Sequence, residues 1–344
     1  MALKLEHSDI DCADEPALVD VVLISYNHER FIAQAIESVL SQQTTFRIRL
    51  IAGDDCSTDN TQAIIRGYGE KNPGCMSLML DSIHRGLESP DRVGFRALTM
   101  TTGKYVAMLD GDDYWIDVNK LQKQVDFLEG HADFTICFHN AQMIYQESAR
   151  EPANYVPENF SEVSTCEDLF IANFIPTSSA MFRRALLDEL PEWYPTMGIG
   201  DWPLHILNAQ HGRIGYLNEP MAGYRVHDKG AWSAGNFISN GLEVIRILDT
   251  FDKHFGFRYQ SQIRAARAEW YYALAETAYQ QGKLDDSRSF LSKHLEHGSN
   301  WPVARRTLSL FLRARQPSVY RALRSIRDSM KSVTTQSPKP TKRV

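Results

Sequence analysis

Short apolar runs alternate with segments of helical periodicity along the first third of the chain. Val19–Ser25 is typical of a buried strand, and residues 30–42 then repeat apolar side chains at helical spacing. The alternation continues with predicted strands at 46–52 and 77–80 and predicted helices at 60–70 and 93–101. Strands and helices of these lengths predict βαβ units and an α/β domain with a mostly parallel, Rossmann-like sheet flanked by helices.

Three carboxylates follow the strand predicted at residues 104–109. Asp110, Asp112 and Asp113 surround Gly111, and carboxylates this close raise one another's pKa unless a cation lies among them. Mn²⁺ or Mg²⁺ suits such oxygen ligands and is typically shared with a substrate phosphate. The alternative is a solvated acidic turn, since Asp and Gly are ordinary turn residues.

A second acidic pair, Asp54 and Asp55, follows the strand predicted at residues 46–52. In open α/β sheets, ligands bind beyond the carboxyl ends of the strands. Two acidic clusters at such ends favour a metal and phosphate site over a pair of solvated turns.

Net charge and cysteine content limit the classes of protein to which this chain can belong. The 344 residues carry a net charge of −6, which argues against nucleic acid as a partner. No run approaches the roughly 18 apolar residues of a membrane span, and residues 1–18 form a polar, flexible leader without a signal-peptide core. The five cysteines are scattered, so we expect no disulfide framework or zinc site and a cytoplasmic location.

Several motifs together carry a family resemblance. They are Ser25-Tyr26-Asn27 with the helix ending Ser38-Val39-Leu40-Ser41-Gln42, the run from Asp54 to Thr61, and Gly103-Lys104-Tyr105 leading to Leu109-Asp110-Gly111-Asp112-Asp113. In this order, over about residues 19–232, they resemble family 2 glycosyltransferases. The resemblance implies the GT-A fold of nucleotide-diphospho-sugar transferases for a catalytic domain at 19–235.

The resemblance also implies roles for individual residues. Tyr26, Asn27 and Asp55 would hold the base and ribose, Asp112 the ribose and metal region, and Asp110 and Asp113 the metal-bound diphosphate. The implied nucleotide-binding set is Ser25, Tyr26, Asn27, Glu29, Asp55, Arg85, Asp110, Gly111 and Asp112, and the implied metal-binding set is Asp112, Asp113 and His227.

One loop departs from the family pattern. His84-Arg85-Gly86 stands where the family usually has Asn-x-Gly. Arg85 either contacts a phosphate in place of the Asn contact or is a solvated surface arginine.

Asp201 is the candidate catalytic base. Followed by Trp202 and Pro203, it is predicted to cap the start of a helix. In the family, an acidic pair at the start of this helix supplies the base, whereas here Gly200-Asp201 leaves a single carboxylate. We predict that Asp201 caps the helix and accepts the proton of the acceptor, with capping alone as the alternative.

Further contacts to the diphosphate or acceptor are expected from two segments. The segment Tyr224-Arg225-Val226-His227 resembles the Tyr-Arg-x-His segment that closes many family 2 domains. The resemblance implies that Arg225 and His227 form a cationic lid over the leaving group. A strand predicted at 175–182 either lines the site or merely has polar residues on one face. The candidate residues are Arg225, Trp232, Thr177, Ser178 and Trp202.

The chain beyond residue 235 changes to helices without strands. A tetratricopeptide-like hairpin is predicted at 267–300 within an all-α region at 236–330, with its turn at Gly282. One such unit must pack on neighbouring helices, on the catalytic domain, or on a protein partner or second copy.

The end of the chain is strongly basic. From Arg305 onward the net charge is +10, which leaves −16 for the rest. The helix predicted at 305–331 either lies on an anionic membrane surface or packs on the core. Residues 331–344 are predicted to be disordered.

These features predict a metal-dependent, non-processive, inverting glycosyltransferase. It would move a sugar from a nucleotide-sugar donor, with a UDP-sugar favoured, to a glycan or lipid-linked saccharide. A place in bacterial surface polysaccharide synthesis is implied by the resemblance to family 2 alone. The chain lacks the Gln-x-x-Arg-Trp motif of processive synthases and the Gly-x-Gly-x-x-Gly of dinucleotide enzymes. The alternative is a catalytically degenerate fold that acts as a partner-binding or regulatory module.

Overall fold

The computed structural model describes residues 16–87, 89–228, 230 and 236–298. The chain forms two compact units, divided between residues 234 and 235. Most of the predicted leader, Trp232, the basic helix at 305–331 and the tail at 331–344 lie outside the described residues.

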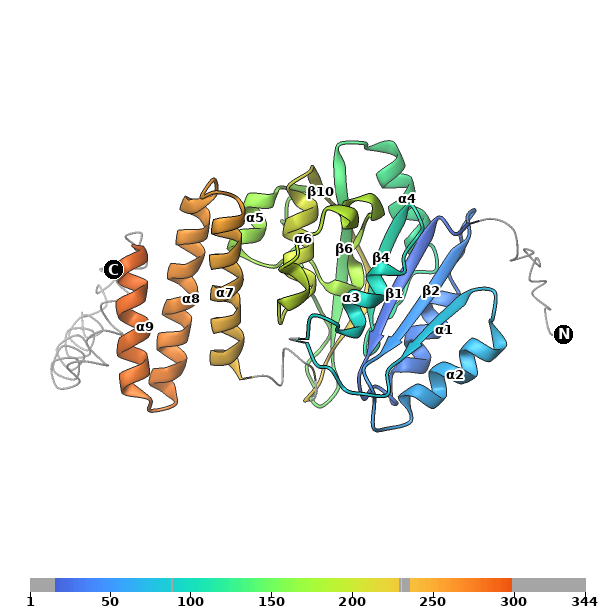
Figure 1. Cartoon of the computed structure of the whole chain (residues 1–344), viewed down its shortest axis with the longest axis horizontal. Coiled ribbons are helices and arrows are strands. Elements are labelled where there is room, and N and C mark those ends of the chain that lie inside the picture. Colours follow the sequence, from blue (N-terminus) through green and yellow to red (C-terminus); the bar gives the residue numbers. More distant parts are fainter. Residues whose placement is uncertain (1–15, 88, 229, 231–235, 299–344) are drawn as a thin grey trace, which may run out of the picture. The chain divides into compact units, whose positions relative to one another are not determined.

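The first unit is built on a mixed sheet, with the strand order β3-β2-β1-β4-β9-β6-β10-β5 in the described part of the chain (Figure 1). The first four strands are parallel to their neighbours, as predicted. Beyond β4 the sheet is mixed: β9 is antiparallel to β4 and β6, and β6 is parallel to β10. The strands are β1 (Val19–Ser25), β2 (Ile48–Asp54), β3 (Met76–Leu80), β4 (Tyr105–Asp110), β5 (Tyr114–Trp115), β6 (Phe134–Tyr145), β7 (Ala153–Asn154), β8 (Val163–Ser164), β9 (Met181–Arg183) and β10 (Arg213–Val226).

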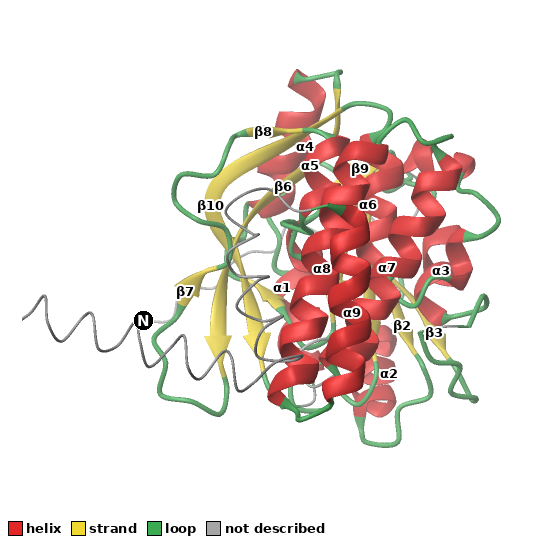
Figure 2. Cartoon of the chain, turned by 90° about the vertical axis from the view of Figure 1, so that its left-hand side faces the viewer, coloured by secondary structure: helices red, strands yellow, loops and turns green. Residues whose placement is uncertain are grey.

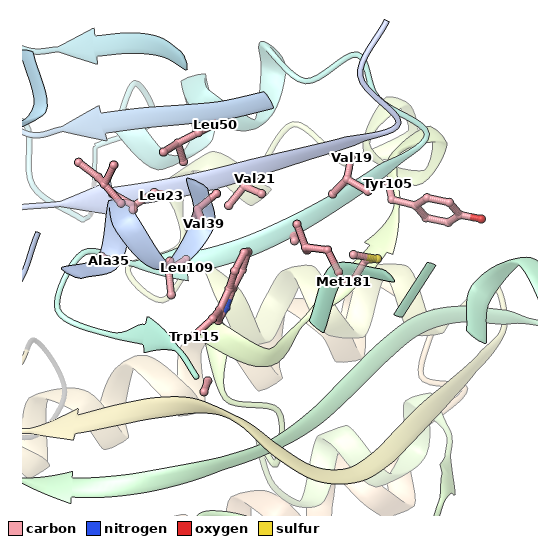
Figure 3. Packing of buried hydrophobic residues seen from close by; sticks show 14 of the residues in the cluster. Val19, Val21, Leu23, Ala35, Val39, Leu50, Tyr105, Leu109, Trp115 and Met181 are labelled. Atoms are coloured by element: carbon pink, nitrogen blue, oxygen red, sulfur yellow. The ribbon is translucent and has the colours of Figure 1, made fainter. Parts of the chain in front are cut away.

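Helices flank this sheet, which confirms the predicted α/β class. Alternate residues of β1, including Val21 and Leu23, pack with Val39 of the first helix into the main core (Figure 3). Period-two alternation gives these strand residues one shared face, and truncating one to Ala costs about 2–5 kcal/mol. The helices are α1 (Ile32–Leu40), α2 (Thr61–Lys71), α3 (Val93–Thr99), α4 (Lys120–Gly130), α5 (Cys166–Ile171) and α6 (Asp201–Ala209).

The segment predicted as a strand at 175–182 folds differently. Thr177–Ser179 forms a 3₁₀ turn, η1, and only Met181–Arg183 is a strand. Pro176 has a backbone at ψ 133° before the turn, and its carbonyl accepts the amide and hydroxyl of Ser179. The side chain of Ser179 therefore makes a local turn hydrogen bond at the position where a strand was predicted.

The second unit contains α7 (Phe237–His254), α8 (Gln260–Gln280) and α9 (Leu284–His297). Helices α8 and α9 form an antiparallel hairpin that turns at Gly282 (φ +76°), as predicted, although α8 begins before residue 267 (Figure 2). Ser287 and His294 bridge to the carbonyls of Ala275 and Ala268. None of the described helices is long and apolar enough to cross a membrane.

Candidate active site

The acidic clusters lie together at the carboxyl edge of the parallel strands. Ser25 at the end of β1 pairs with Asp54 of β2, and Ile24 pairs with Asp110 of β4. Because these strands end side by side, the turns that follow them form one continuous rim.

Asp110 is a half-buried residue at the end of β4. Burial raises its pKa to about 8, and the charges of Asp112 and Asp201 act in the same direction. Burial and like charge therefore favour the protonated form of Asp110 when no cation is bound.

Asp113 is buried more deeply. Its Oδ1 accepts the backbone N–H of Arg225 at 2.8 Å, and its Oδ2 is buried without a hydrogen-bond partner among the residues that the structure describes. Burial, with the charges of Asp112 and Asp110, raises its pKa well above the usual value. An orphaned oxygen in a cluster of like charges is a position that a cation would stabilise.

Asp112 lies between two histidines. Its Oδ2 is 3.0 Å from Nε2 of His227 and 3.6 Å from Nε2 of His28. Burial pushes the pKa of Asp112 up, but the His227 hydrogen bond and the His28 charge bring it below its usual value. The same hydrogen bond raises the pKa of His227, whereas burial lowers that of His28.

The donor set suits Mn²⁺ or Mg²⁺ only when a substrate completes it. Within the described ranges, no three His, Cys, Asp or Glu side chains converge on one point, so the predicted set of Asp112, Asp113 and His227 is not assembled. Asp112 and His227 do meet, and the unpartnered Oδ2 of Asp113 is a further oxygen donor in the cluster. Two or three protein ligands with phosphate oxygens are the usual arrangement for these ions.

Asp201 is the first residue of α6, and Gly200 rather than Asp201 is the N-cap. The Oδ2 of Asp201 accepts the Thr177 hydroxyl at 3.1 Å and the Asn173 side-chain amide at 3.2 Å. The carboxylate is thus fixed from two sides, at a helix end whose dipole favours negative charge.

Two of the residues predicted to contact the diphosphate or acceptor are buried. Trp202 is 3% exposed and its indole N–H donates to the Leu169 carbonyl, so it does not face an acceptor. The hydroxyl of Ser178 is also buried, beside Asp113.

The guanidinium of Arg225 lies between two aromatic rings, 4.4 Å from the centroid of Tyr114 and 4.8 Å from that of Phe31. It donates to the Asp112 carbonyl and to Gln34. In this position Arg225 supports the loop that carries Asp112, whereas the sequence suggested that it forms a lid over the diphosphate.

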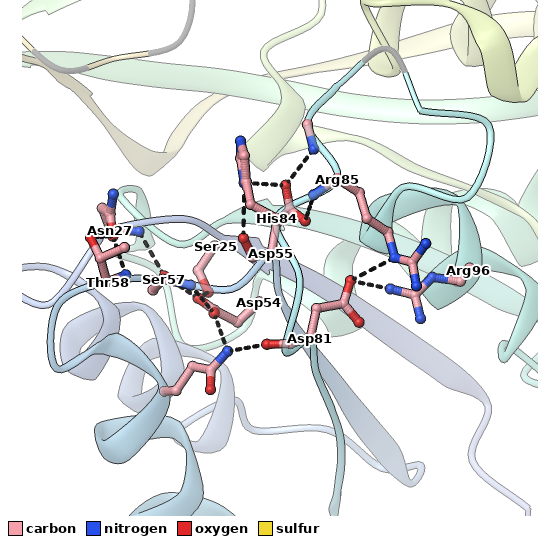
Figure 4. Close-up of polar contacts among 12 residues, drawn as sticks. Ser25, Asn27, Asp54, Asp55, Ser57, Thr58, Asp81, His84, Arg85 and Arg96 are labelled. Atoms are coloured by element: carbon pink, nitrogen blue, oxygen red, sulfur yellow. Dashed lines mark hydrogen bonds and ion pairs between the residues drawn. The ribbon is translucent and has the colours of Figure 1, made fainter.

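Polar residues at and after the end of β1 form hydrogen bonds with those at and after the end of β2 (Figure 4). Ser25 donates to Asp54, the Asn27 side chain accepts from Thr58, and Glu29 accepts from the Asn60 amide and side chain. Asn27 (φ +58°) and Cys56 (φ +59°) both adopt the left-handed conformation that lets these turns meet. Adding a Cβ at Gly111 would bring it within 2.8 Å of Ser25, which explains the glycine there.

Asp55 organises the loop after β3. Its carboxylate accepts the amides of Arg85 and Gly86 at 2.8 and 2.9 Å, and it pairs with Nδ1 of His84 at 2.9 Å. The Arg85 guanidinium is turned to Asp81 and Asp91, where it forms ion pairs. The structure thus gives Arg85 carboxylate partners rather than an open phosphate position.

Sequence reasoning missed three residues of the site. His28 had no spacing signal because only folding brings it to Asp112. Asn173 belongs to a loop with no motif, yet it holds Asp201. Arg92 is buried, donates to the carbonyls of Pro195 and Met197, and so supports the loop before Asp201.

Comparison with known proteins identifies the fold and family. The family described as Glycosyl transferase family 2 matches residues 20–191. An uncharacterised protein of Mycobacterium bovis is 36% identical over 216 residues, covering 62% of this chain and 60% of that protein. The chain thus spans less than two thirds of the length of this curated relative.

Two solved structures share the fold. The poly(ribitol-phosphate) β-N-acetylglucosaminyltransferase TarS of Staphylococcus aureus is 24% identical over 236 residues, covering 66% of this chain and 39% of TarS. Its residues 1–349, in complex with UDP-GlcNAc, superpose with a TM-score of 0.50 at 17% identity, covering 82% of this chain and 93% of that one. A mannosyltransferase of Pyrobaculum calidifontis, in complex with GDP-Man and Mn²⁺, gives a TM-score of 0.54 at 16% identity, covering 94% of this chain and 89% of that one.

Proposed function

The chain belongs to glycosyl transferase family 2, and from this membership we propose that it is a metal-dependent, inverting and non-processive glycosyltransferase. Its donor is a nucleotide-diphosphate sugar, with a UDP-sugar favoured, and its acceptor is a hydroxyl of a glycan or lipid-linked saccharide. Surface polysaccharide synthesis in bacteria is the process that this chemistry serves.

The observation that carries the proposal is the placement of Asp201. Thr177 and Asn173 fix its carboxylate, and its charge raises the pKa of Asp110 at the end of β4. The turn that carries Thr177 also lies against β4, because the Met108 amide donates to the Ala180 carbonyl at 3.2 Å. The base and the acidic cluster at the end of β4 therefore belong to one site. A sugar held between them has a proton acceptor on one side and a charged leaving group on the other.

The reaction follows from these positions. The nucleotide lies along the rim with its diphosphate at Asp112 and His227, which would also hold Mn²⁺ or Mg²⁺. The ion, when bound, neutralises charge on the departing nucleoside diphosphate. Asp201 accepts the proton of the acceptor hydroxyl as that oxygen attacks the anomeric carbon. A single displacement, without a covalent intermediate, inverts the anomeric centre.

The relatives support the choice of donor and ion. TarS binds UDP-GlcNAc and the Pyrobaculum enzyme binds GDP-Man with Mn²⁺, so both take nucleotide-diphosphate sugars. The name of TarS, a transferase acting on poly(ribitol-phosphate), supports a polymeric acceptor and the polysaccharide pathway. Peripheral membrane contact through 305–331 and protein association through the helical unit remain predictions.

Titration of nucleotides tests the proposal. UDP, GDP, dTDP and CMP would be added to the full chain by calorimetry, with Mn²⁺ and with a chelator. Micromolar binding of one nucleoside diphosphate that the chelator abolishes is the expected result. If none binds under either condition, the proposal fails and a partner-binding role for the fold takes its place.

A further inference from the structure

We propose that the first half of the basic segment, residues 305–316, packs on an apolar face of the hairpin formed by α8 and α9. The sequence leaves two alternatives for this segment, an anionic membrane surface and the folded chain, and the second unit offers a matching surface for it. The contact lies within the second unit, so it does not depend on the proposed transferase activity.

Helix α7 covers one side of this hairpin. α8 lies between α7 and α9 (Figure 1), and Ile245 of α7 packs with Tyr271 and Leu274 of α8. Phe290 of α9 extends the same cluster. That side of the hairpin therefore has its partner helix within the described residues.

A second apolar cluster marks another face of the hairpin. Leu291 of α9 is 1% exposed and packs with Tyr272 and Tyr279 of α8. Leu284 lies seven residues before Leu291 and Leu295 lies four residues after it, so the three leucines share one side of α9. Leu284 and Leu295 are 41% and 49% exposed. We call these five residues the outer face, and its exposed leucines are apolar surface that a further helix would bury.

Acidic side chains border the outer face on both helices. On α8, Glu269 and Glu276 lie three residues before its two tyrosines, which places them on the adjoining ridge. On α9, Asp285 and Glu296 directly follow its two exposed leucines, and both are exposed. Arg288 pairs with Asp285 at 3.0 Å. These five side chains together carry a net negative charge.

Residues 305–316 have the complementary pattern. Leu308, Phe311 and Leu312 recur at helical spacing and form one apolar stripe, with Leu310 on the opposite side of the predicted helix. The segment carries four arginines and no acidic residue. An apolar stripe among arginines fits an apolar face bordered by carboxylates, and such charge complementarity favours the matching surface over others.

The connection to α9 has the length of a short loop between helices. α9 ends at His297, Gly298 (φ +83°) follows it, and Arg264 of α8 donates to the carbonyls of Glu296 and His297. Residues 298–304 then precede the segment, and loops of about two to eight residues join neighbouring helices in bundles. A helix over 305–316 spans about 18 Å, against about 21 Å for α9. The segment therefore has the reach and the length to lie antiparallel to α9 along the outer face.

Hydrogen–deuterium exchange of the full chain, followed by mass spectrometry, tests this contact. Amides of 305–316 should exchange at least about tenfold more slowly than in a free peptide of the same sequence. In the double variant Leu284→Asp/Leu295→Asp, carboxylates oppose the apolar stripe, and the slowing should fall below about threefold. Leu242→Asp, at a leucine of α7 that is 42% exposed, is the matched control and should keep the slowing.

Changes within the segment itself leave the hairpin untouched. Leu308→Asp/Leu312→Asp should remove the slowing, because both changes fall on the apolar stripe. Leu310→Asp makes the same kind of change on the opposite side of the predicted helix and should keep it. This pair of variants decides the question if Leu284→Asp/Leu295→Asp does not fold.

Four results would contradict this assignment. Exchange of 305–316 at the free-peptide rate in the full chain would show that the segment is not packed. Slowing that appears only with anionic phosphatidylserine vesicles would assign the segment to a membrane. Slowing that depends on protein concentration would assign it to a second copy of the chain. Slowing that survives in both double variants would place the contact on another surface.

Discussion

The hydroxyl of Thr177 lies 3.1 Å from Oδ2 of Asp201, and this contact joins a 3₁₀ turn to the first residue of a helix. Thr177 also lies against Asp110, where its hydroxyl opposes the rise of the Asp110 pKa. One hydroxyl thus stands between the proposed base and the acidic cluster.

Replacing Asp201 by Asn should leave donor binding within about twofold and lower kcat by about 10²- to 10⁴-fold, because the amide cannot accept the acceptor's proton. Sugar transfer and nucleotide affinity would be measured separately. Asp188→Asn, at an exposed aspartate paired with Arg184, is the control and should remain active. An Asp201→Asn enzyme with wild-type turnover would reject this residue as the base.

Replacing Thr177 by Val should lower kcat by about tenfold, since one of the two donors that fix Asp201 is lost. Thr177→Ser keeps the hydroxyl and should retain most of the activity. Steady-state kinetics of the two variants make the comparison. A Thr177→Val enzyme with wild-type kcat would show that the hydrogen bond to Asp201 does not matter.

Replacing Asp112 by Asn should weaken Mn²⁺-dependent binding of the nucleotide by about 10- to 100-fold, because an amide oxygen is a poorer ligand and loses the charge paired with His227. Calorimetry with and without chelator measures this. Asp126→Asn, on the exposed side of α4, should bind as wild type does. Unchanged affinity in Asp112→Asn would remove this residue from the metal site.

Replacing Arg225 by Lys should destabilise the protein by about 1–3 kcal/mol without any nucleotide present. Lysine cannot fill the planar position between Phe31 and Tyr114. Urea unfolding measures the change, and Arg213→Lys, an exposed position on the same strand, should lie within about 0.5 kcal/mol of wild type. A loss of affinity with unchanged stability would instead support a direct contact to the diphosphate.

Replacing His205 by Leu should stabilise the protein, and more so in acid. His205 is fully buried, and neither ring nitrogen has a partner among the described residues. Burial lowers its pKa to about 4 from an ordinary 6.5, so the unfolded chain takes up the proton first as pH falls. Stability is therefore lost as pH falls from 6.5 towards 4, by up to about 3 kcal/mol.

Urea unfolding at pH 7.5 and pH 5 in the presence of chelator would show this difference. The free energy of unfolding of His205→Leu, relative to wild type, should rise at the lower pH. His131→Leu, at an exposed position, controls for loss of a solvated histidine. A difference that stays constant between the two pH values would show that His205 does not titrate on unfolding.

The parallel half of the sheet could be predicted because each of its strands is a short apolar run followed by polar turn residues. β1 was predicted at its observed limits, Val19–Ser25. β10 was not predicted, since Asn218, Glu219 and Pro220 interrupt its apolar pattern at register shifts in the ladder. Such irregularities are set by pairing with β6, which a local pattern does not encode.

The site residues that are contiguous in the sequence could be predicted. Those that come from separate loops and meet only in the folded chain were missed. Asp110, Asp112 and Asp113 form a contiguous signal at a strand end. His28 and Asn173 reach the site only through the turn after β1 and the loop before η1. Arg225 was identified by its motif, but its place between two rings depends on Phe31, the residue before α1, and on Tyr114 of β5.

The left-handed backbone at Cys56 bears on how sequences of this kind diverge. Asn27 suits its own left-handed position, whereas a side chain such as Cys is disfavoured there by about 1 kcal/mol. Mutation of this codon to Asn, which tolerates a left-handed backbone, would therefore raise stability without changing the residues proposed for chemistry. A lineage that acquires that change gains tolerance for destabilising substitutions in the acceptor-facing loops, where new substrate preferences arise.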